Sequence, residues 1–187
     1  MDALQALLGR RSASRLVEPA PAGAQRERIL RSALQAPDHA RLRPWRFLLV
    51  EGDGRQALGE AMARAMRRHD PQAEPAALDK LRANPLRAPL VVVLLACIRE
   101  HPKVPALEQQ LSVACATQCM LLAAHAEGFG GIWRTGPVTW LPELGAELGL
   151  REGEQLLGFL YIGTPESAPA PVEPPAPDAH FRTWPDT

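Results

Sequence analysis

The stretch from Ala106 to Glu127 constrains the fold most, because its apolar residues leave almost no polar face. A helix that is apolar nearly all round has to be buried, so we expect it to cross the centre of the core. At about 1.5 Å per residue it would be ~30 Å long, and Gly128 is placed to end it as a C-terminal cap. Polar residues interrupt the run Leu111–Ala126, which therefore falls short of a membrane span.

The remaining pattern predicts a mixture of helices and strands. The run Val91–Leu95 is continuous and mostly β-branched, which is typical of a strand buried on both faces. The segment 71–85 is polar and gives no clear prediction, and 131–134 is a short strand or a loop. The other predicted helices cover residues 1–9, 22–35, 55–68 and 139–148, the last capped by Thr139, and the other predicted strands cover 45–51 and 155–162.

Composition narrows the class of protein. The 187 residues fit one domain, and the 21 basic residues balance the 21 acidic ones. Proteins that bind nucleic acid or membrane surfaces usually carry a positive excess, so we expect neither partner. The three cysteines are an odd number in apolar surroundings, which favours reduced thiols and a cytoplasmic protein over a disulfide framework.

The composition changes near the C-terminus. Residues 165–187 hold a large share of the 19 prolines and cannot form a core alone. We therefore expect a folded domain over residues 1–165 and a proline-rich, extended arm over 166–187. The arm is either a disordered tail or a segment laid over something else, such as a second subunit.

Two clusters have the chemistry of an anion site. Arg10, Arg11 and Ser12 follow the first predicted helix, with Arg15 nearby, and guanidinium groups bind phosphate through paired hydrogen bonds. The alternative is a solvated turn. The run 128–136 combines four glycines with Trp133 and Arg134, which suits close approach to a ligand, although a tight turn accounts for part of it.

Three further motifs have simpler explanations beside the functional ones. His39 follows the helix-ending Pro37 and could hydrogen-bond a planar cofactor, but a lone histidine is more often a surface or core residue. The run 52–57 fits the dinucleotide fingerprint G-x-G-x-x-A after a predicted strand. Glu51 and Asp53 would oppose a pyrophosphate there. Cys115 and Cys119 lie one turn apart, yet nothing completes a metal site, so we expect buried thiols.

Together these pieces resemble the bacterial nitroreductase family, and in particular its compact, short-chain branch. The resemblance extends from Met1 to about Pro165. It is carried by several short motifs in the same order, namely 1–4 (MDAL), 10–15 (RRSASR), 36–39 (APDH), 44–45 (PW), 128–134 (GFGGIWR) and 158–165 (GFLYIGTP).

The resemblance implies an α+β fold, with a central, mostly antiparallel sheet flanked by helices, in an intertwined homodimer with two FMN sites at its interface. The helix 106–127 would lie in the dimer core. Residues matching Arg10, Arg11 and Ser12 hold the FMN phosphate and ring edge. Those matching Gln35 and His39 reach the flavin from the opposite subunit, although close relatives tend to have Arg in place of Gln35. The backbone of Gly131, Ile132 and Trp133 lines the isoalloxazine, and Arg134 helps with phosphate.

The resemblance also implies the reaction. NAD(P)H passes a hydride to flavin N5 and leaves, and a flat, electron-poor small molecule such as a nitroaromatic or a quinone then takes the electrons in a ping-pong cycle. No catalytic side chain is expected. Two alternatives stay open, an FMN-binding protein without turnover, and a flavin-free, NAD(P)-dependent Rossmann dehydrogenase.

Overall fold

Strand β3 (Leu90–Cys97) lies inside a five-stranded sheet, and its residues are buried from Leu90 through Ala96. The computed structural model describes residues 1–168, 170 and 172–185. All strand pairs are antiparallel: β3 pairs with β2 (Trp45–Glu51) on one side and with β5 (Glu154–Pro165) on the other. The long β5 also pairs with β1 (Leu16–Val17) and β4 (Gly130–Arg134) along its other edge.

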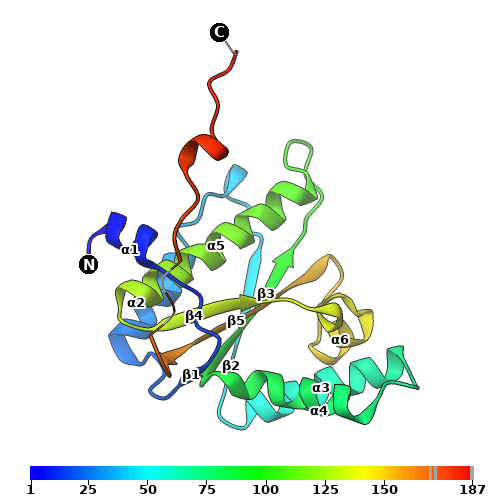
Figure 1. Cartoon of the computed structure of the whole chain (residues 1–187). Coiled ribbons are helices and arrows are strands. Elements are labelled where there is room, and N and C mark those ends of the chain that lie inside the picture. Colours follow the sequence, from blue (N-terminus) through cyan, green and yellow to red (C-terminus); the bar gives the residue numbers. More distant parts are fainter. Residues whose placement is uncertain (169, 171, 186–187) are drawn as a thin grey trace.

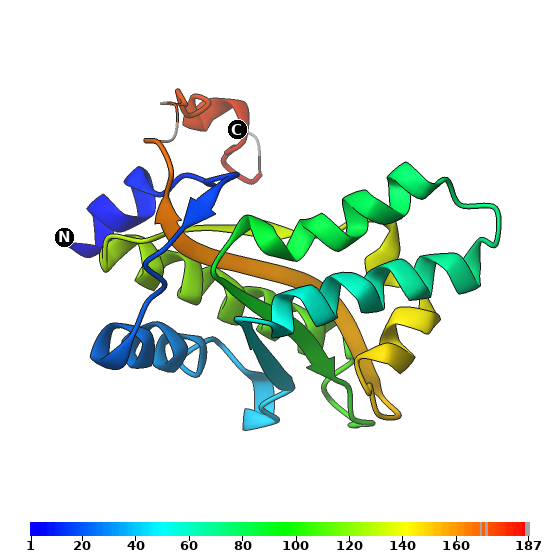
Figure 2. The same cartoon turned by 90° about the horizontal axis from the view of Figure 1, so that it is seen from below.

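Helices cover both faces of this sheet (Figures 1 and 2). Alternate residues of β3 face opposite cores. Leu90, Val92 and Leu94 pack with α2 (Gly23–Ala33) and α5 (Ala106–Ala126). Val91, Val93 and Leu95 pack with α3 (Gly54–His69) and α6 (Pro142–Glu147). The helix α4 (Pro75–Ala83) packs on α3, and α1 (Ala3–Gly9) contacts α5. Short 3-10 turns cover His39–Arg41 (η1), Asn84–Arg87 (η2), Pro137–Trp140 (η3) and Pro177–Ala179 (η4).

This arrangement confirms the predicted α+β fold with an antiparallel sheet between helices. It also shows why the dinucleotide fingerprint at 52–57 misleads. The motif does lie between a strand and a helix, at the junction of β2 and α3. A Rossmann fingerprint, however, belongs to a parallel βαβ unit, whereas β2 runs antiparallel to β3. The sheet therefore rules out the Rossmann alternative.

Three local predictions need correction. α5 has the predicted length and ends before Gly128, whose φ of +88° suits a C-terminal cap, but one face is exposed in the single chain. Leu107 is 62% and Leu111 is 54% exposed on that face, and Cys115 is exposed as well rather than buried. Thr139 does not cap a helix: it lies in η3, and α6 begins at Pro142.

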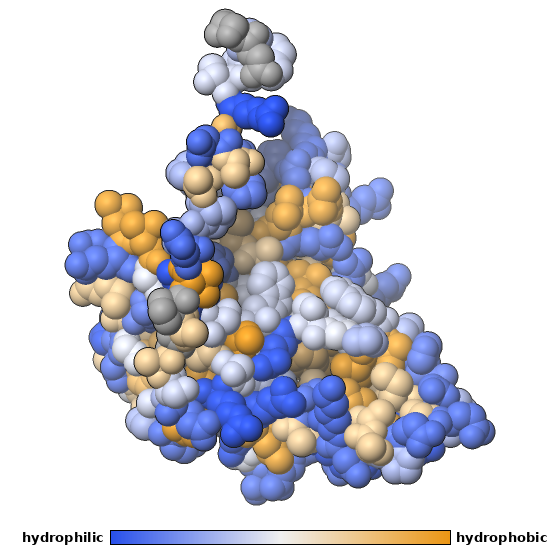
Figure 3. Space-filling model, in the orientation of Figure 1, coloured by the Kyte–Doolittle hydropathy of each residue, from blue (hydrophilic) through white to orange (hydrophobic). Residues whose placement is uncertain are grey.

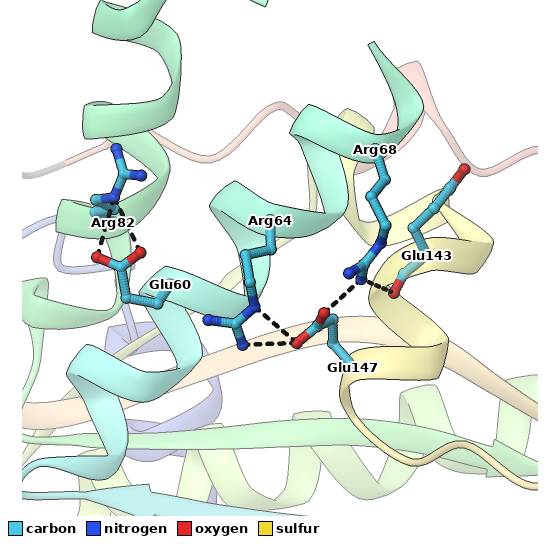
Figure 4. Close-up of polar contacts among 6 residues, drawn as sticks. All are labelled: Glu60, Arg64, Arg68, Arg82, Glu143 and Glu147. Carbon is cyan, nitrogen blue, oxygen red and sulfur yellow. Dashed lines mark hydrogen bonds and ion pairs between the residues drawn. The ribbon is translucent and has the colours of Figure 1, made fainter. Parts of the chain in front are cut away.

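An ion-pair belt ties α6 and α4 to α3 (Figure 4). Arg64 and Arg68 of α3 both donate to the carboxylate of Glu147 at the end of α6, the Arg64 bond being 2.6 Å long. On the other flank of α3, Glu60 accepts two bonds from Nε of Arg82 in α4, at 3.0 and 3.1 Å. These ion pairs hold α4 and α6 against α3. A single exposed ion pair of this kind adds little to the stability of the fold.

The chain leaves this body after β5. Figure 1 shows the segment after Pro165 running away from the sheet, with η4 on it. Within the described ranges, no helix combines the length and the apolar character needed to cross a membrane.

Candidate functional site

The arginine-rich N-terminal loop lies against the glycine-rich strand. A capping box between Asp2 and Gln5 starts α1, which ends at Gly9 and leads directly into Arg10. Ser12 then forms a parallel bridge with Gly131, and the Ala13 N–H donates to the Gly131 carbonyl oxygen at 3.3 Å. Two motifs that are about 120 residues apart in the sequence therefore lie side by side.

Within the described residues, only some of the guanidinium nitrogens of these two motifs have a hydrogen-bond acceptor. Arg11 donates to the carbonyl oxygens of Leu8 at 2.8 Å and Val172 at 3.2 Å. By contrast, Nη1 of Arg10 and Nε of Arg134 are buried without a hydrogen-bond partner among the described residues. Leaving a buried donor unsatisfied costs ~1 to 3 kcal/mol, and more when the group is charged. Such groups are suited to an anionic ligand, which would supply the missing acceptors.

Three adjoining cavities lie along these residues. The first, about 660 Å³, is lined by the loop 11–15 and by described residues of the segment after β5. The second, about 460 Å³, shares Ser14, Arg15 and Glu166 with the first. The third, about 610 Å³, shares Arg87 and Arg134 with the second and continues between α3, α4 and η3. Shared lining residues thus link the three cavities from the N-terminal loop to α4, and we refer to the three together as the crevice.

The residues of β4 face different ways. Ile132 packs on the core beneath α3, whereas a Cβ on Gly131 would lie 2.9 Å from Cδ2 of Leu121 and 3.2 Å from the Tyr161 carbonyl oxygen, so packing favours a glycine there. Trp133 is 36% exposed, and its indole N–H donates to the Leu157 carbonyl oxygen at 3.2 Å. Arg134 lies 5.8 Å from the centre of the Tyr161 ring and donates to the Ser14 carbonyl oxygen at 3.2 Å. Trp133 and Arg134, adjacent in a strand, therefore project to opposite sides.

The other edge of β4 stays open over much of its length. β5 pairs with all five β4 residues along one edge, while the Ser12 bridge to Gly131 occupies the other. Backbone groups of Trp133 and its neighbours on that edge have no strand partner within the part of the chain that the structure describes. An open edge of this kind offers backbone hydrogen bonds to a flat ligand.

Gln35 and His39 are not near this cluster in the single chain. His39 Nδ1 lies 2.8 Å from Oε2 of Glu108, in the first turn of α5, and Gln35 is exposed after α2. Gly9, beside Arg10, lies instead against His125 in the last turn of α5. Seventeen residues of helix separate the two places, about 25 Å. His39 and the loop that begins at Arg10 thus lie at opposite ends of α5.

The sequence alone does not single out three residues, two of which line the crevice and one of which contacts His39. Arg87 lies in η2, just before the buried strand β3, and lines two of the three cavities. Tyr161 sits within β5, where its sequence context suggests only a core residue. Glu108, the partner of His39, looks like an ordinary first-turn acid. Nothing local in the sequence distinguishes them, since their importance arises from contacts across the fold.

Residues 7–164 match the model of the nitroreductase family. The chain belongs to this family. It is 45% identical over 166 residues to the protein named "Putative NAD(P)H nitroreductase YdjA" from Escherichia coli strain K12, covering 89% of this chain and 90% of that one. It is 37% identical to a relative of the same description from Haemophilus influenzae, covering 88% and 89% of the two chains.

Solved structures of the family share the fold. A nitroreductase-like family protein from Bacillus cereus superposes with a TM-score of 0.83 at 22% identity, covering 98% of this chain and 96% of that one. NfnB from a Sphigopyxis species, an FMN- and NADPH-dependent nitroreductase, gives a TM-score of 0.75 at 20% identity and covers 98% and 99%. The nitroreductase family therefore accounts for both the sequence motifs and the architecture of this chain.

Proposed function

We propose that this nitroreductase-family chain is an FMN-dependent oxidoreductase that takes electrons from NAD(P)H and passes them to nitroaromatic or quinone-like acceptors. The observation that carries the proposal is the pair of unsatisfied, buried guanidinium atoms, Arg10 Nη1 and Arg134 Nε, beside the open edge of β4. The names of the relatives agree, since they describe NAD(P)H nitroreductases and, in NfnB, FMN dependence.

The residues present fit FMN. Its phosphate is a dianion that needs several donors, and Arg10, Arg11 and Ser12 come together next to a cavity of about 660 Å³. Arg134, 5.8 Å from the Tyr161 ring, adds a second cation farther along the crevice. The flat isoalloxazine needs close backbone approach, which Gly131, Ile132 and Trp133 offer on the open side of β4. FMN, when bound, supplies the two-electron chemistry that no side chain of the chain provides.

The side chains would tune that chemistry through charge and position. Arg10 or Arg11 would stabilise negative charge on a reduced flavin held beside them. Backbone groups of β4 would hold the ring through hydrogen bonds that need no movement of side chains. The crevice would limit the access of water, which would strengthen both effects. In this proposal, solvent would supply the protons.

The functional unit proposed is a homodimer. His39 contacts Glu108, which is about 25 Å along α5 from His125 beside Gly9, so we propose that His39, and with it the exposed Gln35, reaches the flavin of a second copy whose α5 runs antiparallel. The face that would mediate this pairing is apolar: Leu107, Leu111 and Cys115 are exposed on α5, and Leu4 and Leu8 are 68% and 73% exposed on α1. Figure 3 shows hydrophobic residues at the surface over α1 and α5.

The arm after Pro165 belongs to this proposal too. Its Phe181 and Trp184 are 77% and 89% exposed, and we propose that they pack on the second copy rather than remain in water. The cysteines are all free, which agrees with function in a reducing cytoplasm.

The test is direct. We expect the purified protein to be yellow, and heating to release FMN rather than FAD, identified by chromatography. NAD(P)H should then bleach the bound flavin without oxygen, and a quinone or nitroaromatic should restore the colour. A protein that stays colourless when mixed with FMN contradicts the proposal. Bound flavin that NAD(P)H cannot bleach would instead favour a binding protein without turnover.

A further inference from the structure

The loop that contains η1 has an unusual backbone. Ala40, Arg41 and Arg43 have φ angles of +60°, +53° and +49°, in the left-handed region that residues other than glycine rarely adopt. The Asp38 carboxylate holds the loop in this form, because its two oxygens accept hydrogen bonds from the backbone N–H groups of Leu42 at 3.2 Å and Arg43 at 2.6 Å. Local strain of this kind persists only where the surrounding structure fixes it, and it clusters at functional sites.

The same loop carries two positive charges that lack a counterion. Arg41 and Arg43 are exposed, and neither guanidinium forms an ion pair or a hydrogen bond with the described part of the chain. The carboxylates of this region are already engaged. Asp38 binds backbone N–H groups, and Oε2 of Glu108 lies 2.8 Å from Nδ1 of His39. The five N–H donors of each guanidinium therefore remain available for an anionic ligand.

The position of the loop links these two charges to the flavin of a second copy. In the proposed dimer His39 reaches that flavin, and Arg41 and Arg43 follow His39 closely in the chain. Since a chain spans at most ~3.6 Å per residue, the Cα atoms of Arg41 and Arg43 lie within ~7 and ~14 Å of that of His39. The proposed function assigns other cations, among them Arg10 and Arg11, to the flavin phosphate. The pair in the loop is thus left for a different anion that approaches the same flavin.

We infer that Arg41 and Arg43 bind the pyrophosphate of the NAD(P)H donor while its nicotinamide lies on the flavin of the second copy. A hydride passes only from a nicotinamide held against the flavin ring, and a single ribose joins that nicotinamide to the pyrophosphate. Guanidinium groups bind phosphate oxygens through paired hydrogen bonds, which suits this anion. NADH and NADPH both carry the pyrophosphate, so the two arginines bind either donor equally. The donor role rests on the proposed function, whereas binding of a nucleotide pyrophosphate can be measured without it.

Two hydride donors that differ in phosphate test the inference during turnover. NADH carries the pyrophosphate, whereas 1-benzyl-1,4-dihydronicotinamide has the same reacting ring and no phosphate. Arg41→Met and Arg43→Met should each raise KM for NADH and for NADPH about tenfold, and should change the rate of flavin bleaching by the benzyl compound less than about twofold. Arg41→Lys and Arg43→Lys should recover part of the loss, because an ammonium keeps the charge. Arg67→Met, on the exposed surface of α3 at the other face of the sheet, is the matched control and should change neither measurement.

A binding measurement makes the outcome independent of turnover. ADP-ribose contains the pyrophosphate but no nicotinamide, and it is titrated by calorimetry into the protein saturated with FMN, with adenosine as the phosphate-free control. The inference predicts that ADP-ribose binds, that Arg41→Met and Arg43→Met each weaken it about tenfold, and that FMN content and circular dichroism are unchanged.

Four outcomes would overturn the inference. They are failure of ADP-ribose to bind, unchanged binding in both variants, loss of FMN from the variants, and an effect on KM that is confined to NADPH or shared by the benzyl compound. If ADP-ribose binds through Arg41 and Arg43 but NADH does not bleach the flavin, the pyrophosphate site stands and the proposed donor chemistry fails.

Discussion

His39 Nδ1 lies 2.8 Å from Oε2 of Glu108, so the imidazole is fixed at the N-terminal end of α5. Arg10 follows Gly9, and a Cβ on Gly9 would lie 3.3 Å from Nε2 of His125 at the C-terminal end of the same helix. The length of α5, about 30 Å, thus separates groups that the family resemblance assigns to a single flavin. In the proposed dimer, an antiparallel pair of α5 helices from two copies would bring such groups together at both ends.

The first prediction concerns this pairing. The wild-type protein should have a dimer mass by light scattering at micromolar concentration, because obligate interfaces usually bury more than ~2,000 Å². Leu111→Glu should shift it toward the monomer and reduce bound FMN, since a charge would be placed in the apolar face of α5. A wild-type monomer, or a Leu111→Glu dimer with full FMN content, contradicts the proposed assembly.

The second prediction uses the cysteines as distance markers. In an antiparallel pair the two-fold axis crosses near the middle of α5, close to Cys115, which is exposed in the single chain. A short bismaleimide should therefore join two native chains, and Cys115→Ser should abolish the product. Cys97→Ser is the control and should leave it unchanged, because Cys97 lies at the end of β3. Cross-linking that survives Cys115→Ser would place the contact elsewhere.

The third prediction concerns Arg10. Arg10→Ala should weaken FMN binding roughly tenfold to a hundredfold, because it removes charge-assisted hydrogen bonds worth ~1.5 to 3 kcal/mol each. Arg10→Lys should recover only part, since an ammonium lacks the planar fork of a guanidinium. Titration followed by flavin fluorescence measures the affinity, and circular dichroism checks the fold. Unchanged affinity in folded Arg10→Ala would remove this residue from the site and weaken the assignment of Arg11 and Ser12.

The parts of the fold that the sequence predicts well are those with strong local signals. The continuous apolar run of β3 and the long α5 appear where periodicity places them, and the positive φ of Gly128 accounts for the end of α5. α4 was missed because its polar residues hide a weak apolar stripe, although Pro75 in its first turn is a usual start signal. Thr139 was misread as a cap because Pro142, three residues later, starts the helix instead.

The same difference between local and long-range signals applies to the residues of the candidate site. Ser12 lies close to Gly131 because β4 pairs with β5, and no local sequence pattern predicts this pairing. The family resemblance nevertheless assigns both residues to one FMN site. Arg87 and Tyr161 are not predicted because each is ordinary in its own segment, and they line the same cavity only through the packing of α4 on α3. The glycines of the 128–136 run, in turn, are partly explained by packing, as Gly131 against Leu121 shows.

A fourth prediction compares two glycines of α3, Gly59 and Gly54. A Cβ on Gly59 would lie 2.3 Å from the backbone oxygen of Arg82, so Gly59→Ala should push α4 away and cost about 1 to 3 kcal/mol. Gly54→Ala, whose Cβ would meet only Val50 Cγ1 at an ordinary 3.5 Å, is the control and should cost nothing. Urea denaturation gives both values. Gly54 is also the second glycine of the dinucleotide fingerprint, so impaired NAD(P)H use in Gly54→Ala would revive the interpretation that the sheet excludes.

The last prediction concerns the belt that holds α6 on α3 and its dependence on pH. Hydrogen bonds from Arg64 and Arg68 hold the pKa of Glu147 at about 2, below its ordinary value of 4.5. Since the carboxyl binds its proton more weakly in the folded chain than in the unfolded one, its contribution to stability is full above about pH 4.5 and is lost as the pH falls toward 2. Glu147→Gln should therefore lower the urea midpoint clearly at pH 7, and the difference from wild type should shrink at pH 3.5. Glu60→Gln removes a pair whose carboxylate is half exposed and should change the midpoint little at either pH. A Glu147→Gln deficit that is equal at the two pH values would mean that packing of α6, rather than the charge on Glu147, accounts for the loss.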